Sequence, residues 1–275
     1  TLAAINPDTG MVESSSSVGV EPGKLAISDD GQFVYVSIDA GRAVAKFHIP
    51  TRTVQQSFSL GNYSVLDMVV LGGASQSLVI ARTELNSGAS GGVAVYDNGV
   101  PRSVTTPGWG QTHDDIPTIL ERSTSNLTIY GFGRSSVFSI SIEPSGATIS
   151  SLQPTSIDGR DMVHEGGLLY FPSGEVYSPI TSSLQGTYPV PSITNVLNRV
   201  LPYPSLNKVF FALWFPQYRW LVFDRTTLAP AGIVDLLDLD GGTGSPFRLI
   251  RWGSNGLALS TDAGQVFIFR SSLFQ

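Results

Sequence analysis

The chain of 275 residues contains no cysteine, few charged residues and no long hydrophobic run. Without cysteine it can form no disulfide, no thiolate metal site and no cysteine nucleophile. The longest unbroken apolar run, Val209–Phe215, is much shorter than the roughly 20 residues of a membrane-spanning helix, so we expect no transmembrane segment. Because Thr1 opens directly into a strand-like run, no signal-peptide pattern is present, and we expect a mature form or an excised part of a larger polypeptide or assembly.

Charged residues make up only 14% of the chain, and the formal net charge is -6. An acidic chain without a basic stripe does not suit a phosphate backbone, so we expect no nucleic-acid partner. The 29 glycines and 17 prolines are typical of an all-β, turn-rich protein. With so little charge we place it outside the cytoplasm, extracellular or at the cell surface, with the periplasm as an alternative.

The stretch Lys24–Leu60 shows the organisation of the whole chain. Four short apolar or alternating runs, LAI, FVYVSI, AVAKFHI and TVQQSFSL, are separated by turn sequences rich in Asp, Gly and Pro. Alternation with a turn every eight to twelve residues or so predicts antiparallel strands joined by hairpins. One four-stranded sheet cannot bury both faces alone, so this stretch predicts one blade of a β-propeller.

Similar units recur at steps of roughly 40 to 50 residues, as in other repeat proteins. Their opening strands begin at Lys24, Asp67, Thr118, Asp161, Arg199 and Arg248. Two further strands precede the first unit, and the last unit stops after three strands. We predict one propeller domain over residues 1–275 with seven four-stranded blades, of which the terminal two are incomplete. Six blades are the alternative, if the two chain ends share one blade.

The segment FVYVSIDAGRAVAKFHIPTRTV, preceded by LAISDDG, resembles the YVTN-type β-propeller repeat. Over its whole length the chain also resembles propeller modules of bacterial secreted and cell-surface proteins. The resemblance implies a secreted or surface-displayed protein, and such modules commonly have no assigned activity. Where the family often has an aspartate before the turn, this chain has Phe47-His48-Ile49.

The opening strands of the blades should bring charged residues to one mouth of the central channel. The predicted ligand-binding residues there are Asp67, Asp161, Arg199 and Arg248. One reading is a structural set of ion pairs between blades, because partly buried charges usually pair. The other is a site for a polar or anionic ligand held by Arg199 and Arg248, since arginine presents a planar fork to carboxylates.

Two loops should share this face of the propeller. The first, GWGQTHDDI, carries Trp109 and His113, and the second carries Trp214 and Tyr218 at an aromatic hairpin tip. Exposed Trp and Tyr side chains are a frequent platform for sugar or peptide contact. Because only one histidine is present locally, we expect a polar loop at His113 rather than a metal site.

These observations predict a non-enzymatic recognition module that binds a protein or carbohydrate partner at the channel mouth. We expect no catalytic residues, no metal and no cofactor. The first alternative is a lactonase- or lyase-type enzyme using Asp67, Asp161, Asp115 and His113. The second is an architectural subunit of a surface layer or filament.

Overall fold

The computed structural model describes most of the chain, and all structural statements here concern that part. The described residues are 1–108, 117–133, 136–154, 157, 161–191, 199–213, 218–236, 244–253 and 256–270, apart from the side chains of Leu152 and Pro154. The chain divides into two compact units, each described by itself. Unit 1 is Thr1–Asn6 with Met11–Ser156, and unit 2 is Pro7–Gly10 with Ile157–Gln275. The prediction of a single domain stays a prediction.

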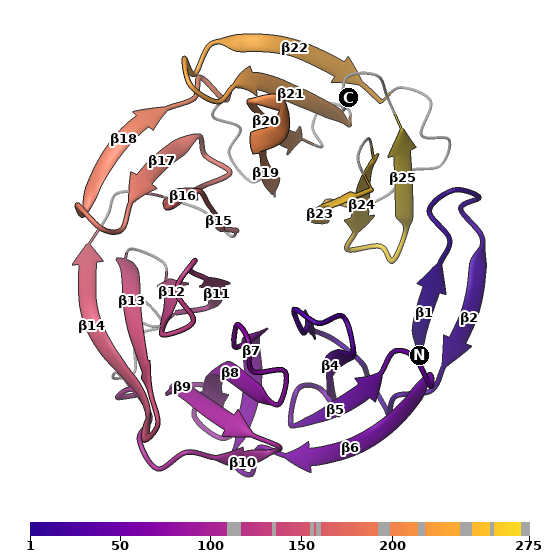
Figure 1. Ribbon diagram of the computed structural model, residues 1–275, viewed down its shortest axis with the longest axis vertical. Coiled ribbons are helices and arrows are strands. Elements are labelled where there is room, and N and C mark those ends of the chain that lie inside the picture. The colour runs from indigo at the N-terminus through magenta and orange to yellow at the C-terminus, as the bar shows by residue number, and fades with distance from the viewer. Residues whose placement is uncertain are drawn as a thin grey trace. The chain divides into compact units, whose positions relative to one another are not determined.

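Unit 1 holds a hairpin and three four-stranded antiparallel blades (Figure 1). The hairpin is β1 (Leu2–Ile5) and β2 (Val12–Ser16). Blade 1 is β3 (Leu25–Ile27), β4 (Phe33–Ile38), β5 (Ala43–His48) and β6 (Thr53–Ser59). Blade 2 is β7 (Tyr63–Val70), β8 (Ser77–Glu84), β9 (Ser90–Asp97) and β10 (Val100–Pro101), and blade 3 is β11 (Ile119–Arg122), β12 (Thr128–Phe132), β13 (Ser136–Glu143) and β14 (Gly146–Pro154).

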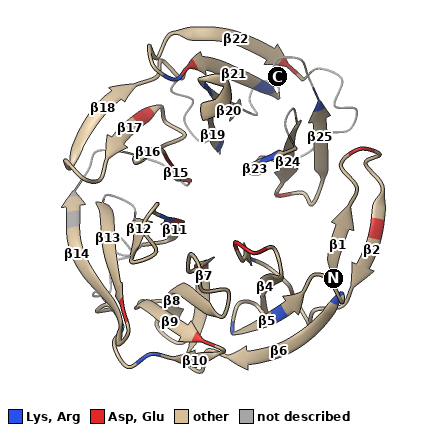
Figure 2. Cartoon of the chain, viewed as in Figure 1, with Lys and Arg blue, Asp and Glu red and all other residues tan. Residues whose placement is uncertain are grey.

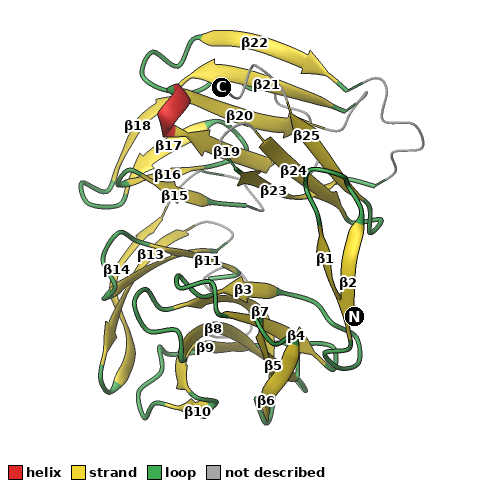
Figure 3. Ribbon diagram, turned by 45° about the vertical axis from the view of Figure 1, so that its right-hand side comes forward, coloured by secondary structure: helices red, strands yellow, loops and turns green. Residues whose placement is uncertain are grey.

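Unit 2 holds two further four-stranded blades and one of three strands. Blade 4 is β15 (Val163–Glu165), β16 (Leu168–Tyr170), β17 (Glu175–Ser178) and β18 (Ser183–Thr187). Blade 5 is β19 (Arg199–Tyr203), β20 (Lys208–Leu213), β21 (Arg219–Asp224) and β22 (Pro230–Asp235), and blade 6 is β23 (Pro246–Trp252), β24 (Gly256–Thr261) and β25 (Val266–Arg270). A 3-10 turn, η2 (Pro204–Leu206), follows β19 and is drawn red in Figure 3. Within the described ranges, no helix has the length and hydrophobicity needed to cross a bilayer.

The fold is therefore an all-β propeller type with four-stranded antiparallel blades, and the expected number of seven blades is wrong. The structure has six, which was the alternative. The N-terminal hairpin does not make a seventh blade, because β1 and β2 pair only with each other among the described strands and none of their residues is fully buried. Instead, Leu2 packs on a small buried cluster formed by Val18, which precedes blade 1, and by Val36 and Phe47 of blade 1.

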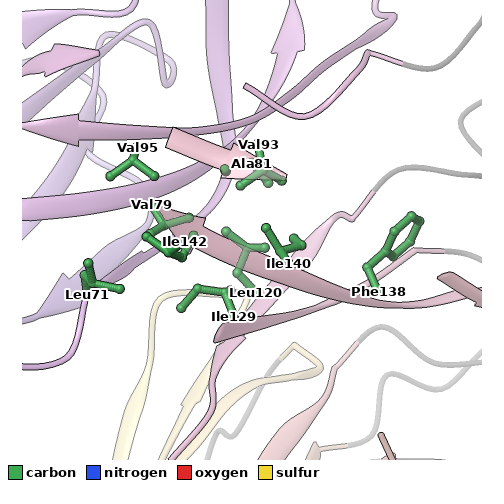
Figure 4. Close-up of a cluster of buried hydrophobic side chains, with 11 residues drawn as sticks. Leu71, Val79, Ala81, Val93, Val95, Leu120, Ile129, Phe138, Ile140 and Ile142 are labelled. Carbon is green, nitrogen blue, oxygen red and sulfur yellow. The ribbon is translucent and has the colours of Figure 1, made fainter. Parts of the chain in front are cut away.

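The hydrophobic cores lie between neighbouring blades. Figure 4 shows the core between blades 2 and 3, where Val79 and Val95 meet Leu120 and Ile140. One face of β5 meets blade 2 through Val44, and on its other face Phe47 packs on Val18 and Leu2, so the four central residues of β5 are buried. The fourth strand β6 has one face in water and alternates between exposed and half-buried residues.

The fourth strand of blade 2 is short, because β10 covers only Val100–Pro101. The chain instead makes an isolated bridge from Val104 to Gly146 of blade 3. Gly146 has a φ of +144°, and a Cβ atom there would overlap the carbonyl group of Val104, so this bridge requires glycine.

A buried tyrosine joins blades 1 and 2 and makes the folded protein less stable at alkaline pH. Tyr35 on β4 is 1% exposed, and its hydroxyl donates to the carbonyl oxygen of Ser75 at 2.8 Å. Burial, with a smaller contribution from the charge of Asp30, raises the pKa of Tyr35 from 10.0 to about 12. Between these values the unfolded chain loses the phenolic proton while the folded chain keeps it, so raising the pH favours unfolding.

We expect Tyr35 to cost the folded state about 2–3 kcal/mol as the pH rises from 10 to 12. Urea unfolding of the wild type and of Tyr35→Phe at a series of pH values measures this cost. At pH 8 the variant should be about 1 kcal/mol less stable, because it lacks the hydrogen bond to Ser75. At pH 12 the order should be reversed, and an unchanged difference across this range would contradict the assignment.

Candidate functional site

In unit 1, Asp67 in the middle of β7 contacts residues next to the starts of β3 and β11. Its Oδ1 lies 3.8 Å from Nζ of Lys24 in blade 1, and its Oδ2 accepts the backbone N–H of Leu120 in blade 3 at 2.9 Å. The Asp67 side chain is 12% exposed and that of Lys24 is 43% exposed. A β-bulge between Val65 and Asp67 precedes this position. One carboxylate therefore ties three successive blades together.

Thr118 does not join this cluster, although its place in the repeat matches Lys24 and Asp67. Its backbone N–H and its hydroxyl both donate to the carbonyl oxygen of Phe132, within blade 3.

In unit 2 the predicted cluster of Asp161, Arg199 and Arg248 is present. Oδ2 of Asp161 lies 3.9 Å from Nε of Arg199, and Oδ1 lies 3.8 Å from Nη1 of Arg248. The side chains of Asp161 and Arg199 are 7% and 8% exposed, whereas that of Arg248 is 54% exposed. These three residues come from the first-strand starts of blades 4, 5 and 6, and Figure 2 shows the positive charge on β19 and β23. These three residues include two cations and one carboxylate, and Asp262 supplies a further negative charge near Arg199.

Burial shifts the pKa of both Asp161 and Arg199, the two buried members of this cluster. It raises the pKa of Asp161, while the charges of Arg199 and Arg248 and the backbone N–H groups of Met162 and Val200 oppose the rise. Burial likewise lowers the pKa of Arg199, against the charge of Asp161. In addition, Nε of Arg199 donates to the carbonyl oxygen of Phe247 at 2.5 Å. Removing this pair from water therefore costs free energy, and hydrogen bonds to blades 4, 5 and 6 hold the two side chains in place.

Tyr218, which precedes β21 of blade 5, is not exposed. The residue is 7% exposed, its hydroxyl donates to the carbonyl oxygen of Gly244, and its ring lies 6.4 Å from that of Phe267. Burial, with the charge of Asp262, raises the pKa of Tyr218. The expectation of an exposed Tyr218 at an aromatic tip is wrong, because blade 6 covers this side chain. Trp109, His113 and Trp214 lie outside the described residues, as do Asp114 and Asp115.

The opposite ends of the first strands carry a second set of contacts, which the sequence reasoning missed. In unit 1, Asp29 after β3 pairs with Arg122 at the end of β11, and its Oδ2 accepts the backbone N–H of Gly73 at 3.1 Å. In unit 2, Oε2 of Glu165 lies 3.4 Å from Nη2 of Arg251. Each ion pair thus joins the first and third blades of its unit.

The guanidinium of Arg251 also lies over the ring of Tyr203, 5.1 Å from its centroid. Tyr203 ends the first strand of blade 5, so the middle blade of unit 2 takes part as well. Aligning the ends of the repeats in the same way as their starts would have found these residues.

Two buried cations in unit 1 lie against aromatic rings. Nζ of Lys46 is 4.1 Å from the centroid of Phe33, and burial lowers the pKa of Lys46 against the charge of Asp30. The guanidinium of Arg82 is 4.2 Å from the centroid of Tyr63. Cation–π contact offsets part of the cost of burying such groups, so both serve the packing of blades 1 and 2.

Among the residues that the structure describes, no three histidine, cysteine or acidic side chains lie together as a metal-binding group. The described site consists of buried charged side chains held in ion pairs, together with one arginine, Arg248, whose side chain is 54% exposed. Such an arrangement suits the binding of an anionic group by charge and hydrogen bonds.

Solved structures similar to this chain have low sequence identity to it, so they show the fold alone. Kuenenia stuttgartiensis hydrazine synthase matches with a TM-score of 0.71 and 15% identity over 98% of this chain and 89% of that one. The β-propeller domain of Myceliophteria thermophila Cps50 (Swd1) matches with a TM-score of 0.70 and 9% identity over 98% and 90% of the two chains.

The C-terminal WD40 domain of Sif2 matches with a TM-score of 0.63 and 13% identity, over 91% of this chain and 69% of that one. No protein-family model and no curated protein sequence matches the chain. The comparisons therefore identify the chain as similar in fold to β-propellers, WD40 domains among them.

Proposed function

We propose that this chain is a non-catalytic interaction module of the YVTN type that acts outside the cytoplasm. It binds a protein or carbohydrate partner in unit 2, at the face where the first strands of blades 4 to 6 begin. The observation that carries this proposal is the contrast between buried and exposed charged side chains among the first-strand residues. Asp67 and Asp161 are held by backbone N–H groups and cations of neighbouring blades, whereas Arg248 is 54% exposed.

The same observation favours an interaction role over the lactonase- or lyase-type alternative. A general base or a metal-binding carboxylate must be able to meet a substrate proton or an ion. The oxygens of Asp67 and Asp161 instead face protein donors, and releasing them would loosen contacts between blades. Interaction modules of the propeller type use exposed side chains on a rigid framework, and Arg248 is such a side chain.

A binding screen tests this role. The full chain, Arg248→Gln and Arg122→Gln would be applied to peptide and glycan arrays. Arg122 is a matched control, since its side chain is 40% exposed and paired with an acidic residue at the opposite ends of the first strands. We expect hits that Arg248→Gln weakens about tenfold and Arg122→Gln leaves unchanged.

Hits that neither substitution changes would place the binding face elsewhere, and a screen without hits would contradict the interaction role. The proposed location is tested by labelling intact cells of the source organism with a membrane-impermeant lysine reagent. An exported protein becomes labelled on intact cells, whereas one labelled only after lysis would overturn that part of the proposal.

A further inference from the structure

β23 differs from the other first strands of unit 2 in how much of its surface meets solvent. All five residues of β19 are buried, whereas Phe247 and Ile250 of β23 are 49% and 50% exposed. The side chains of Arg248 and Arg251 are 54% and 39% exposed. β23 therefore presents two neighbouring pairs, each an apolar residue followed by an arginine.

Apart from the carbonyl oxygen of Phe247, which accepts the Nε–H of Arg199, the backbone of β23 can accept an additional strand. Of the described strands, β24 alone pairs with it. Phe247 is the residue of a β-bulge between Pro246 and Arg248, and bulges commonly re-aim a side chain next to a binding site. An extended peptide can therefore lie along this strand, with main-chain hydrogen bonds supplying affinity and side chains supplying specificity.

The charge of β23 is opposite to that of the chain as a whole. The protein has a net charge of -6, but β23 itself, PFRLIRW, contains two arginines and no acidic residue. The carboxylates that contact Arg248 and Arg251 belong to blade 4, and that of Asp161 is buried. A partner with negative charge is complementary to this strand and is repelled by much of the remaining surface.

We propose that β23 binds an extended acidic segment of a partner protein in which an apolar residue and a carboxylate recur every three residues. The inference rests on the proposed interaction role and names the chemistry of the partner. Residues facing each other on paired strands share one side of the sheet. For a segment that runs parallel to β23, carboxylates three residues apart, about 10 Å along an extended chain, thus match Arg248 and Arg251, and the apolar residue before each carboxylate matches Phe247 or Ile250.

Fluorescence anisotropy with short labelled peptides tests the inference on the full chain. The probe is Thr-Leu-Glu-Thr-Leu-Glu-Thr, blocked at both ends, with matched peptides carrying Gln or Lys in place of Glu. We expect the Gln peptide to bind at least tenfold more weakly than the Glu peptide and the Lys peptide not to bind. Raising the salt concentration from 0.05 to 0.3 M should weaken the Glu peptide several-fold, because exposed charges are screened.

Two substitutions on β23 and two matched controls locate the binding. Arg248→Gln and Ile250→Ser should each weaken binding of the Glu peptide about tenfold. Arg122→Gln and Ile27→Ser remove side chains of similar exposure from unit 1 and should change binding less than twofold. Circular dichroism of each variant establishes that it is folded.

Equal binding of the Glu and Gln peptides, or full binding by folded Arg248→Gln and Ile250→Ser, would overturn the inference. Failure of the inference can be told apart from failure of the proposed function. Array hits that depend on Arg248 but are glycans or neutral peptides would preserve the interaction role and exclude the acidic segment. Absence of both array hits and peptide binding would exclude both.

Discussion

Replacing Asp161 by alanine is expected to lower the free energy of unfolding by about 3–5 kcal/mol. The substitution leaves Arg199, whose side chain is 8% exposed, without its buried counter-charge. It also removes the acceptor for the backbone N–H groups of Met162 and Val200. Leaving one member of a buried ion pair unpaired costs more than the pair contributes when it is intact, because the remaining charge stays desolvated.

Urea unfolding of the wild type and variant measures the effect, and two further variants identify its cause. Asp67→Ala is the matched control: its cation, Lys24, is 43% exposed and can regain water, so we expect a loss of only about 1–3 kcal/mol. In the double variant Asp161→Leu with Arg199→Met, no buried charge is left alone. It should be more stable than Asp161→Ala, and a double variant that is less stable would contradict the unpaired-charge explanation.

Replacing Phe211 by alanine should cost the folded protein about 3–5 kcal/mol. Phe211 on β20 is 0% exposed and lies between blades 4 and 5, with ring centroids 5.4 Å from Tyr188 and 5.5 Å from Phe223. Alanine removes the transfer free energy of the ring and leaves a cavity that β-strands on both sides cannot easily close.

The same urea experiment with Phe211→Leu and Phe247→Ala shows whether burial is responsible. Phe211→Leu keeps most of the apolar volume and should lose less than half as much stability. Phe247 is 49% exposed, so its removal should change the free energy of unfolding by about 0.5 kcal/mol or less. A similar loss in all three variants would mean that the substitutions act on the unfolded chain.

The strands were largely predictable from the sequence because short-range signals determine them. In Lys24–Leu60, alternation gives the four strands, and turn residues with positive φ, such as Asp39 and Gly41, give their limits. The number of blades was not predictable in this way. A strand pair such as Leu2–Ile5 with Val12–Ser16 has the same local sequence pattern whether or not it belongs to a blade with its own core. Only the packing of the folded chain shows that this pair has no core of its own.

The site was only partly predictable because its contacts join residues far apart in the sequence. Aligning the starts of the repeats correctly brought Asp161, Arg199 and Arg248 together. It could not show that the second oxygen of Asp67 accepts a backbone N–H from Leu120, since every residue but proline offers such a donor. Nor could it show that Tyr218 is buried, because aromatic residues at a strand start are found both in cores and at surfaces.

The pairing of Asp29 with Arg122 and of Glu165 with Arg251 has a consequence for how such a chain can change its length during evolution. Repeat proteins gain and lose units by recombination between similar segments. Loss of blade 1 or blade 4 alone would leave an arginine of a surviving blade without its acidic partner, whereas loss of blades 1 to 3 or of blades 4 to 6 as a set would remove both partners together. We therefore expect insertions and deletions among homologues of this chain to occur in sets of three blades more readily than singly.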